Sequence, residues 1–284
     1  MKNSIIGIIF LLAVGTAGAL HFRAKNMLEI KFVVGKNIVE TAKQSNIPEF
    51  NVSNTNGLLH YQVMQLPPDV IAVYNRPGFE IRSAPVFSLN FWADRGRSKI
   101  DAVHAFQVKL DTEKITNHRA AQDLIESIIV QFRAGKWQRR ISANCPAVTG
   151  RSAYLNVDGA IDSGGCALDP EFAVSHEDWM TLFATRQSFE WLGDGVFSKL
   201  SILYDDAASI PAYEIVLLFE DYKTTFAIDL ENEKRRLELG DAKGWNSSAT
   251  TARELLANQE KIKVLEAHAA KRGDKTLVRI KDPE

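Results

Sequence analysis

The segment at residues 85–135, PVFSLNFWADRGRSKIDAVHAFQVKLDTEKITNHRAAQDLIESIIVQFRAG, decides the fold class. Its first part holds two stretches rich in β-branched and aromatic residues, 85–91 and 100–110, which predict strands joined by a charged turn. A helix is predicted next, from Thr116 as N-cap to Gly135 as stop, because apolar residues recur at spacings of three and four: Leu124, Ile125, Ile128, Ile129 and Phe132. Strand, strand, helix in this order is an α+β pattern.

The flanking sequence extends this pattern in both directions. Before it, the apolar stretches 27–34 (MLEIKFVV) and 69–74 (DVIAVY) predict strands, separated by the polar, turn-rich segment 45–57. After it, 196–204 (VFSKLSILY) and 212–219 (AYEIVLLF) predict two more strands. A short helix capped by Ser175 and a turn at Gly193-Asp194-Gly195 precede those strands. The arrangement is compatible with two related halves, although aligned identities are too few to establish a repeat.

The C-terminal part is charged and helical. Segments 230–239 (LENEKRRLEL) and 252–272 (ARELLANQEKIKVLEAHAAKR) predict helices split near 240–248. Leu255, Ile262 and Ala269 recur every seven residues, but two heptads are too few for a coiled coil, so solvated helices packed along the sheet are expected.

We therefore expect an α+β fold of antiparallel sheets with packed helices and a helical C-terminal tail. Its predicted regions are a signal peptide or anchor (1–19), a β-containing region (20–84), an α+β core with a disulfide loop (85–225) and a charged helical region (226–284).

The first twenty residues, MKNSIIGIIFLLAVGTAGAL, have the three-part layout of a secretory signal peptide. The small residues Ala17 and Ala19 predict cleavage before Leu20. An uncleaved anchor is the alternative, because the apolar stretch reaches the short limit for crossing a bilayer of about 30 Å and basic residues follow it. No Cys follows the stretch, which excludes a lipoprotein anchor. Both export hypotheses place the remaining chain outside the cytosol, whereas a buried N-terminal helix is disfavoured because no polar face interrupts the run.

The chain has two cysteines, Cys145 and Cys166, which lie 21 positions apart in a turn-rich stretch. Two cysteines in an oxidising compartment most often pair, and closing this loop would stabilise the fold by about 3 kcal/mol. Two free buried thiols are the alternative. A metal site is disfavoured because there is no CxxC motif and no His lies near either residue.

No motif in the sequence specifies catalysis. Residues 162–165, DSGG, resemble the nucleophile turn of chymotrypsin-like proteases, but His104 falls in a predicted strand and His118 opens a predicted helix, so Ser163 lacks a base. The adjacent acid pairs at 205–206 and 220–221 are typical of solvated strand ends. We therefore predict no catalytic residue, no cofactor and no metal, and hence not an enzyme.

Charge is distributed unevenly along the chain, although its total is only −1 and gives no reason to expect nucleic acid. Residues 127–157 contain no acid and these five bases: Arg133, Lys136, Arg139, Arg140 and Arg151. Residues 205–241 are strongly acidic. Such asymmetry suits either a charged protein partner or a solvated face, and loop tips commonly carry recognition, so Asp194, Asp205 and Asp206 are the predicted partner-binding residues. Three tryptophans with apolar neighbours are instead predicted to lie in the core: Trp137, Trp179 and Trp191.

Three stretches carry a family resemblance: GKWQRRISANCPAVTGRSAYLN, GGCALDP and FEWLGDGVFSKLSILYDD. They resemble proteobacterial immunity proteins encoded beside type VI secretion lipase effectors, over residues 85–225. The resemblance implies an exported, non-catalytic protein that binds a phospholipase toxin in the periplasm and blocks it. Many members carry a lipobox Cys, and its absence here leaves membrane attachment open.

The leading functional expectation is therefore a periplasmic immunity protein whose partner is a secreted lipase or phospholipase, and which covers that toxin without turnover. Two alternatives of other classes remain: a periplasmic hydrolase without a recognisable motif, and an envelope scaffold protein anchored to the inner membrane by its N-terminal segment.

Overall fold

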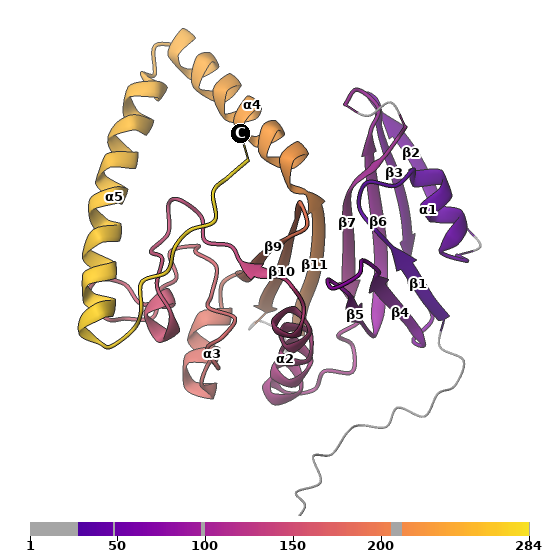
Figure 1. The fold of residues 1–284 in the computed structure, drawn as a ribbon, viewed down its shortest axis with the longest axis horizontal. Helices are drawn as coiled ribbons and strands as arrows, with labels where there is room; N and C mark the ends of the chain where they lie inside the picture. Colours follow the sequence, from indigo (N-terminus) through magenta and orange to yellow (C-terminus); the bar gives the residue numbers. More distant parts are fainter. Residues whose placement is uncertain (1–27, 48, 98–99, 206–211, 284) are drawn as a thin grey trace, which may run out of the picture.

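The computed structural model describes residues 28–47, 49–97, 100–205 and 212–283, and within them the fold is α+β (Figure 1). The predicted signal peptide, with Ala17 and Ala19, lies outside the described residues.

The larger sheet holds eight strands in the order β2-β3-β6-β7-β11-β10-β9-β8, and all neighbours are antiparallel. Its strands are β2 (Asn51–Thr55), β3 (Leu58–Met64), β6 (Val86–Asp94), β7 (Val103–Leu110), β8 (Gln138–Arg139), β9 (Gln187–Gly193), β10 (Val196–Asp205) and β11 (Ala212–Asp221). The triplets β3-β6-β7 and β9-β10-β11 meet where β7 pairs with β11. Each triplet is followed by a helix, α2 (His118–Ala134) or α4 (Tyr222–Ala242), so the topology has two similarly built halves.

A smaller sheet packs on one face of the larger sheet, which we call the inner face, over the half that contains β6 and β7. It holds β1 (Leu28–Phe32), β4 (Val70–Tyr74) and β5 (Ile81–Ser83), with β1 parallel and β5 antiparallel to β4. Helix α1 (Ile38–Gln44) follows β1 and is capped by the Asn37 side chain. Because β3 pairs with β6, the regions predicted as 20–84 and 85–225 share the larger sheet.

The core is aromatic and lies on that inner face. Phe32 of β1 stacks on Phe106 of β7, and Tyr74 of β4 stacks on Phe219 of β11 with ring centroids 4.5 Å apart. Over the other half, Phe132 of α2 stacks on Trp191 of β9 at 3.8 Å. The three tryptophans predicted to be internal, Trp137, Trp179 and Trp191, are 8%, 4% and 2% exposed, which confirms that prediction.

The opposite face of the larger sheet is polar. Asn90 of β6 donates to Gln107 of β7 at 3.0 Å, and Lys199 of β10 forms an ion pair with Glu190 of β9 at 3.3 Å. One packed and one polar face is the usual arrangement of an antiparallel sheet, and it explains the alternation along β7 and β10.

Two local predictions were wrong. The polar segment 45–57 contains β2 and leads into β3 through a tight turn at Asn56 and Gly57, both with positive φ, a pairing typical of two-residue hairpins. Helix α2 is capped by Asn117 and not by Thr116, because the Asn117 side chain accepts from the Ala120 amide at 2.8 Å. Gly135 ends the helix as predicted.

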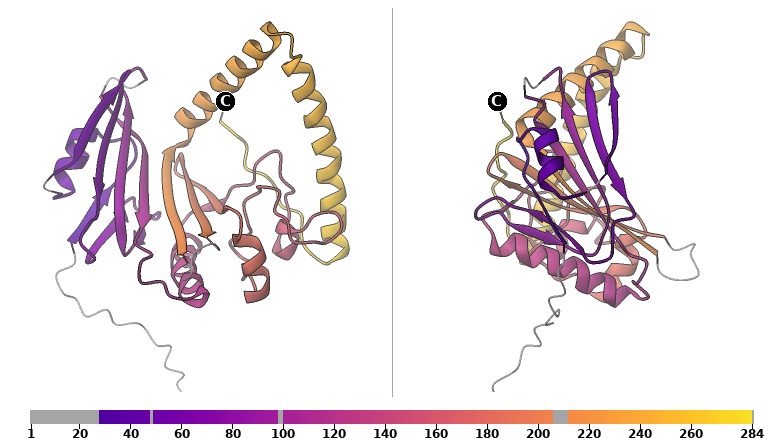
Figure 2. Two further views of the ribbon diagram at one scale, coloured as in Figure 1. Left: turned by 180° about the vertical axis from the view of Figure 1, so that it is seen from behind. Right: turned by 90° about the vertical axis from the view of Figure 1, so that its right-hand side faces the viewer.

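The C-terminal helices project from the sheet, which corrects the expectation that they pack along it. Helix α4 starts directly after β11, and α5 (Ser247–Lys271) turns back at a sharp angle (Figures 1 and 2). We call residues 222–271 the arm. Its foot, at the C-terminal end of α5, rests on the 3-10 helix η1 (Gly150–Tyr154), with Ala269 packed against Val148 and Ala153.

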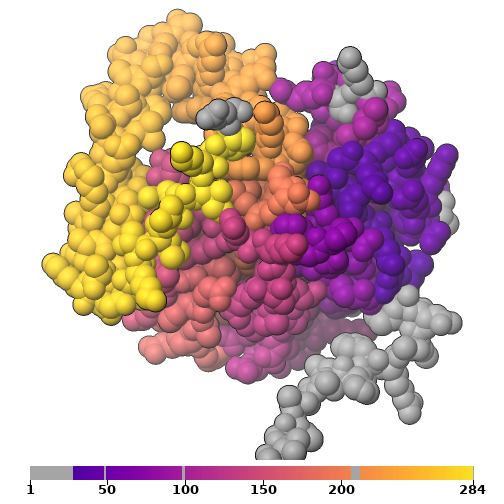
Figure 3. Space-filling model, viewed as in Figure 1, coloured from indigo at the N-terminus to yellow at the C-terminus, as the bar shows by residue number. Residues whose placement is uncertain are grey.

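The residues after the arm, which we call the tail (272–283), run back across the molecule from the foot toward the base of α4 (Figure 3). Among the described residues, no helix is both long and apolar enough to cross a membrane.

Replacing Phe132, the central aromatic residue of α2, should measure how much the packing of α2 on the larger sheet contributes to stability. We expect Phe132→Ala to lower the free energy of unfolding by about 3–5 kcal/mol, because it leaves a cavity beneath Trp191. Urea denaturation followed by tryptophan fluorescence measures this. The control is Val130→Ala on the same helix, where the side chain is 49% exposed and a change below about 1 kcal/mol is expected. Equal effects of the two substitutions would contradict this account of the core.

Candidate partner-binding surface

The two cysteines form the predicted disulfide. Cys145 and Cys166 are bonded, with their Cα atoms 5.7 Å apart. The bridge closes a loop that begins after β8 and contains η1. A bonded pair fits an oxidising compartment outside the cytosol.

The acid-free stretch 127–157 is not a free positive surface. Four of its arginines form ion pairs with acids from other parts of the chain: Arg133 with Glu171, Arg139 with Asp169, Arg140 with Glu190, and Arg151 with Asp178. Arg139 and Asp169 are the most buried of these pairs, with side chains 10% and 4% exposed. The arginines of the basic stretch therefore act as internal cross-links of the disulfide loop and of the segments on either side of it.

Asp178, in helix α3 (His176–Phe183), is the most heavily bonded of these acids. It accepts from Nε and Nη2 of Arg151, both at 2.8 Å, and from the Tyr154 hydroxyl at 2.8 Å. The Arg151 bonds are the main cause that holds the pKa of Asp178 below its usual value. Since α3 begins at the Ser175 cap, as predicted, the helix delivers this carboxylate to η1.

The three predicted partner-binding acids do not form one patch. Asp194 lies in the β9–β10 turn and is ion-paired with Arg76. Asp205 is the last residue of β10, so the ten residues of that strand separate it from the turn by about 30 Å. Asp206 lies outside the described residues. The Asp194 turn is at the end where the arm begins, because the Tyr222 amide donates to the Gly195 carbonyl at 2.9 Å.

Ser163 is held as a structural residue. It is 8% exposed, and its hydroxyl donates to Oε1 of Gln187 at 2.7 Å. His118 lies at the start of α2, where Nδ1 is 2.6 Å from the Tyr213 hydroxyl. Trp179 Nε1 also donates to that hydroxyl, at 2.9 Å, so the hydroxyl proton is available to His118. The structure therefore places His118 in an aromatic cluster, while the Ser163 hydroxyl is engaged by Gln187 and not by a histidine base.

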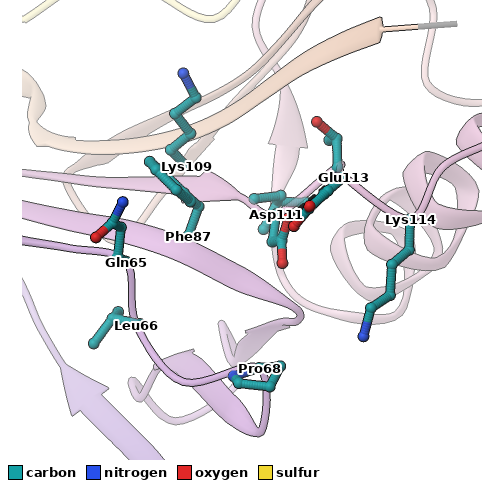
Figure 4. A pocket seen from close by; sticks show the side chains of 10 residues that line it. Gln65, Leu66, Pro68, Phe87, Lys109, Asp111, Glu113 and Lys114 are labelled. Carbon is teal, nitrogen blue, oxygen red and sulfur yellow. Dashed lines mark hydrogen bonds between the residues drawn. The ribbon is translucent and has the colours of Figure 1, made fainter. Parts of the chain in front are cut away.

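An open groove, which the sequence did not indicate, lies between the β3–β4 and β7–α2 connections. Its volume is about 620 Å³, and Figure 4 shows Lys109 and Lys114 at its rim with Asp111 and Glu113 between them. Lys109 lies over the ring of Phe87 at 5.9 Å. Both charge signs line this groove, so it selects neither anions nor cations.

Glu220, beside the joint between β11 and α4, is the strongly perturbed carboxyl among the strands. The pKa of Glu220 is raised to about 7, chiefly by burial and also by the nearby Asp229 of α4, while Lys199 of β10 lowers it. The next residue, Asp221, caps α4 through the Thr224 amide at 2.8 Å. The sequence pair 220–221 therefore divides into one half-buried acid and one helix cap.

Comparison with protein-family models, with curated proteins and with solved structures finds no match.

Removing the charge of Asp178 should loosen the link between α3 and η1. We expect Asp178→Asn to lower the free energy of unfolding by about 2–3 kcal/mol, because it leaves the Arg151 and Tyr154 bonds without their acceptor charge. Because the pKa of Asp178 is depressed in the folded state, this stability is present near neutral pH and is lost as pH falls.

Chemical denaturation at pH 7 provides the test. Asp123→Asn is the matched control, because Asp123 is 63% exposed and pairs with Arg119 on the surface of α2, where a loss below about 0.5 kcal/mol is expected. An Asp178→Asn effect as small as that of the control would refute the cross-linking role.

Glu220 should make stability fall as pH rises. Its folded pKa of about 7 exceeds the value near 4.3 expected for the unfolded chain. The folded state is therefore favoured while the carboxyl is protonated, and that gain disappears as pH rises through 7.

We expect the wild type to lose of the order of 2 kcal/mol between pH 5 and pH 8 relative to Glu220→Gln, a figure that allows for partial solvent screening. Denaturant midpoints at both pH values measure the difference. Glu214→Gln, on the same face of β11 and paired with the exposed Arg186, should track the wild type. Parallel pH profiles for wild type and Glu220→Gln would disprove the assignment.

Proposed function

We propose that this chain is an exported, non-catalytic binding protein that acts as an immunity protein. It neutralises a periplasmic lipase or phospholipase toxin of a type VI secretion system by binding the toxin and covering its active site. The protein acts in the periplasm after signal cleavage or while anchored at the inner membrane, and it takes no cofactor.

The arm is the observation that carries the proposal. Four of its large apolar side chains are more than half exposed: Leu230 (56%), Leu239 (57%), Trp245 (67%) and Leu256 (64%). They contribute little to the core of this chain, and exposed apolar groups on a projecting element are typical of protein-binding surfaces. Trp245, at the apex between α4 and α5, has the size and polarity of a residue that dominates binding energy in interfaces.

Two further features support export and binding. The chain has a disulfide, and disulfides are typical of proteins that mature in an oxidising compartment. The Asp194 turn stands at the arm's end of the sheet, so a toxin held by the arm reaches that acid, whereas Asp205, at the other end of β10, serves a partner that extends along the sheet.

Inhibition by occlusion should be stoichiometric. With toxin well above the dissociation constant, lipase activity should fall linearly with added protein and reach zero near one inhibitor per toxin. Activity that declines with time at substoichiometric protein would reveal turnover, and so favour the hydrolase alternative.

Removing exposed apolar side chains from the arm should show whether the arm forms the interface with the toxin. We expect Trp245→Ala combined with Leu256→Ser to weaken toxin binding at least tenfold, because they remove the most exposed apolar groups of the arm. Isothermal titration calorimetry measures the affinity, and Val52→Ser, at a 50% exposed site on the edge strand β2, is the matched control.

Charge reversal at Asp194 should slow association, because its turn lies at the end of the sheet where the arm begins. Reversal of Asp205 together with Asp206 should slow it only for a partner that extends along the sheet. Unchanged affinity in the arm variant would move the interface elsewhere, and indifference to both reversals would remove these acids from it.

Location should matter as much as affinity. A chain without residues 1–19 should bind the toxin in vitro with unchanged affinity but fail to protect cells, because inhibitor and toxin then lie on opposite sides of the membrane. Survival of toxin-exposed cells, with expression levels matched by immunoblot, gives the readout. Full protection by the shortened chain would contradict a periplasmic site of action.

A further inference from the structure

The segment around Cys145 carries the foot of the arm and the tail. Contacts to α5 come from both sides of the cysteine: the Asn258 side chain donates to the Asn144 carbonyl at 3.0 Å, and the Ala147 amide donates to Glu266 at 2.9 Å. Within the part of the chain that the structure describes, α5 is held away from its apex by these bonds, by the Ala269 packing and by its two other buried side chains, Ile262 and Leu265, which lie beside Cys166.

The tail is held by the same segment. The Leu277 amide donates to the Ala147 carbonyl at 2.7 Å, and Nη2 of Arg279 donates to the Cys145 carbonyl at 2.5 Å. Leu277 also packs with Cys166 against a small buried cluster that contains Cys145 and Ala147. The disulfide is therefore part of the surface on which the tail lies.

Cys166 belongs to a segment that is fixed to the larger sheet. Ser163 is bonded to Gln187 of β9, and the Leu168 amide donates to the Ser188 carbonyl at 2.8 Å. The disulfide thus joins the segment that carries the arm's foot to a segment that is docked on a core strand.

The base of the arm is anchored elsewhere. Arg140 lies over the rings of Phe197 and Tyr222, at 5.3 and 5.6 Å, and pairs with Glu190. The Tyr222 hydroxyl donates to Asp282 of the tail. This anchor follows β8 directly and does not pass through the sulfur bridge, so the base and the foot can be released separately.

We propose that the Cys145–Cys166 disulfide is a redox latch: while it is oxidised, it holds the foot of the arm and the tail against the core. A thiol reductant RSH opens it in the balanced reaction Cys–S–S–Cys + 2 RSH → 2 Cys–SH + RS–SR, in which the cysteine sulfurs are reduced and the reductant is oxidised. In the open state the 142–149 segment loses its cross-link to the segment docked on β9 and stays joined to the sheet only through β8, and α5 and the tail separate from the core while the sheets stay folded. The arm is then seated only in an oxidising compartment. This inference rests on the contacts of the disulfide loop and does not require the toxin partner.

Hydrogen exchange on the full mature chain tests the latch. Three samples are compared: oxidised protein, the same protein reduced with dithiothreitol, and the Cys145→Ser, Cys166→Ser double variant. We expect amides in 258–283 to exchange at least tenfold faster without the bridge, while those of β7 and β11 keep their protection. A uniform loss of protection, or no change in 258–283, would overturn the proposal.

A second pair of variants keeps the disulfide intact. Leu277→Ser with Arg279→Ala removes the side-chain contacts of the tail with the Cys145 segment, and thiol counting confirms that the bridge remains. We expect the tail and the foot to exchange faster in this variant even when it is oxidised. Lys263→Ala, at an exposed site on α5 paired only with its neighbour Glu260, is the control and should leave exchange unchanged. Full protection of the foot in the tail variant would show that these contacts do not seat the arm, and would equally refute the latch.

Discussion

The pairing of β7 with β11 is the constraint on which the rest of the structure depends. Each strand ends one triplet of the larger sheet, and their register places Phe106 opposite Phe219 at the centre of the inner face. Phe32 of the smaller sheet stacks on Phe106, and Tyr74 stacks on Phe219. Phe132 of α2 also lies near Phe219, with ring centroids 6.5 Å apart. A one-residue slip of β7 against β11 would move Phe106 to the polar face and take from Phe32 of the smaller sheet the ring on which it stacks.

A second set of forces organises the region outside this core. The disulfide loop has little regular structure, and it is fixed by ion pairs from Arg139 and Arg151 and by the sulfur bridge. Because the arm's foot rests on this loop, its position depends on polar and covalent contacts more than on apolar burial. The molecule therefore combines a packed two-sheet core with a projecting element held by contacts of a different chemical kind.

Strong periodicity made the centre of the fold predictable from sequence. The strands at 86–94 and 103–110, the helix α2 and both arm helices follow from alternation and helical spacing. The hairpin of β2 and β3 was not predicted, because β2 (NVSNT) is an exposed edge strand with almost no apolar residues. Its Asn-Gly turn is nevertheless a sequence signal for a hairpin. Strand β9 was missed although Phe189 and Trp191 alternate with polar residues, because the alternation is short; both faces of the strand are in fact buried.

Contacts between residues far apart in the sequence limited how much of the candidate site could be predicted. The disulfide was predictable because the chain has two cysteines and an export segment. The ion pairs were not, since Arg140 and Glu190 are fifty positions apart and no local pattern joins them. The separation of Asp194 from Asp205 was implicit in the predicted strand between them, whereas the Arg76 partner of Asp194 was not.

The tail has a consequence for the order in which the molecule assembles. Its contacts come from Leu277, Arg279 and Asp282, all of which follow β11, the last strand of the larger sheet, in the sequence. Because a chain is made from its N-terminus, both sheets can pair before these residues have been synthesised. The circuit formed by the arm and the tail therefore closes after the sheets, when Asp282 reaches Arg140 and Tyr222 at the base of α4.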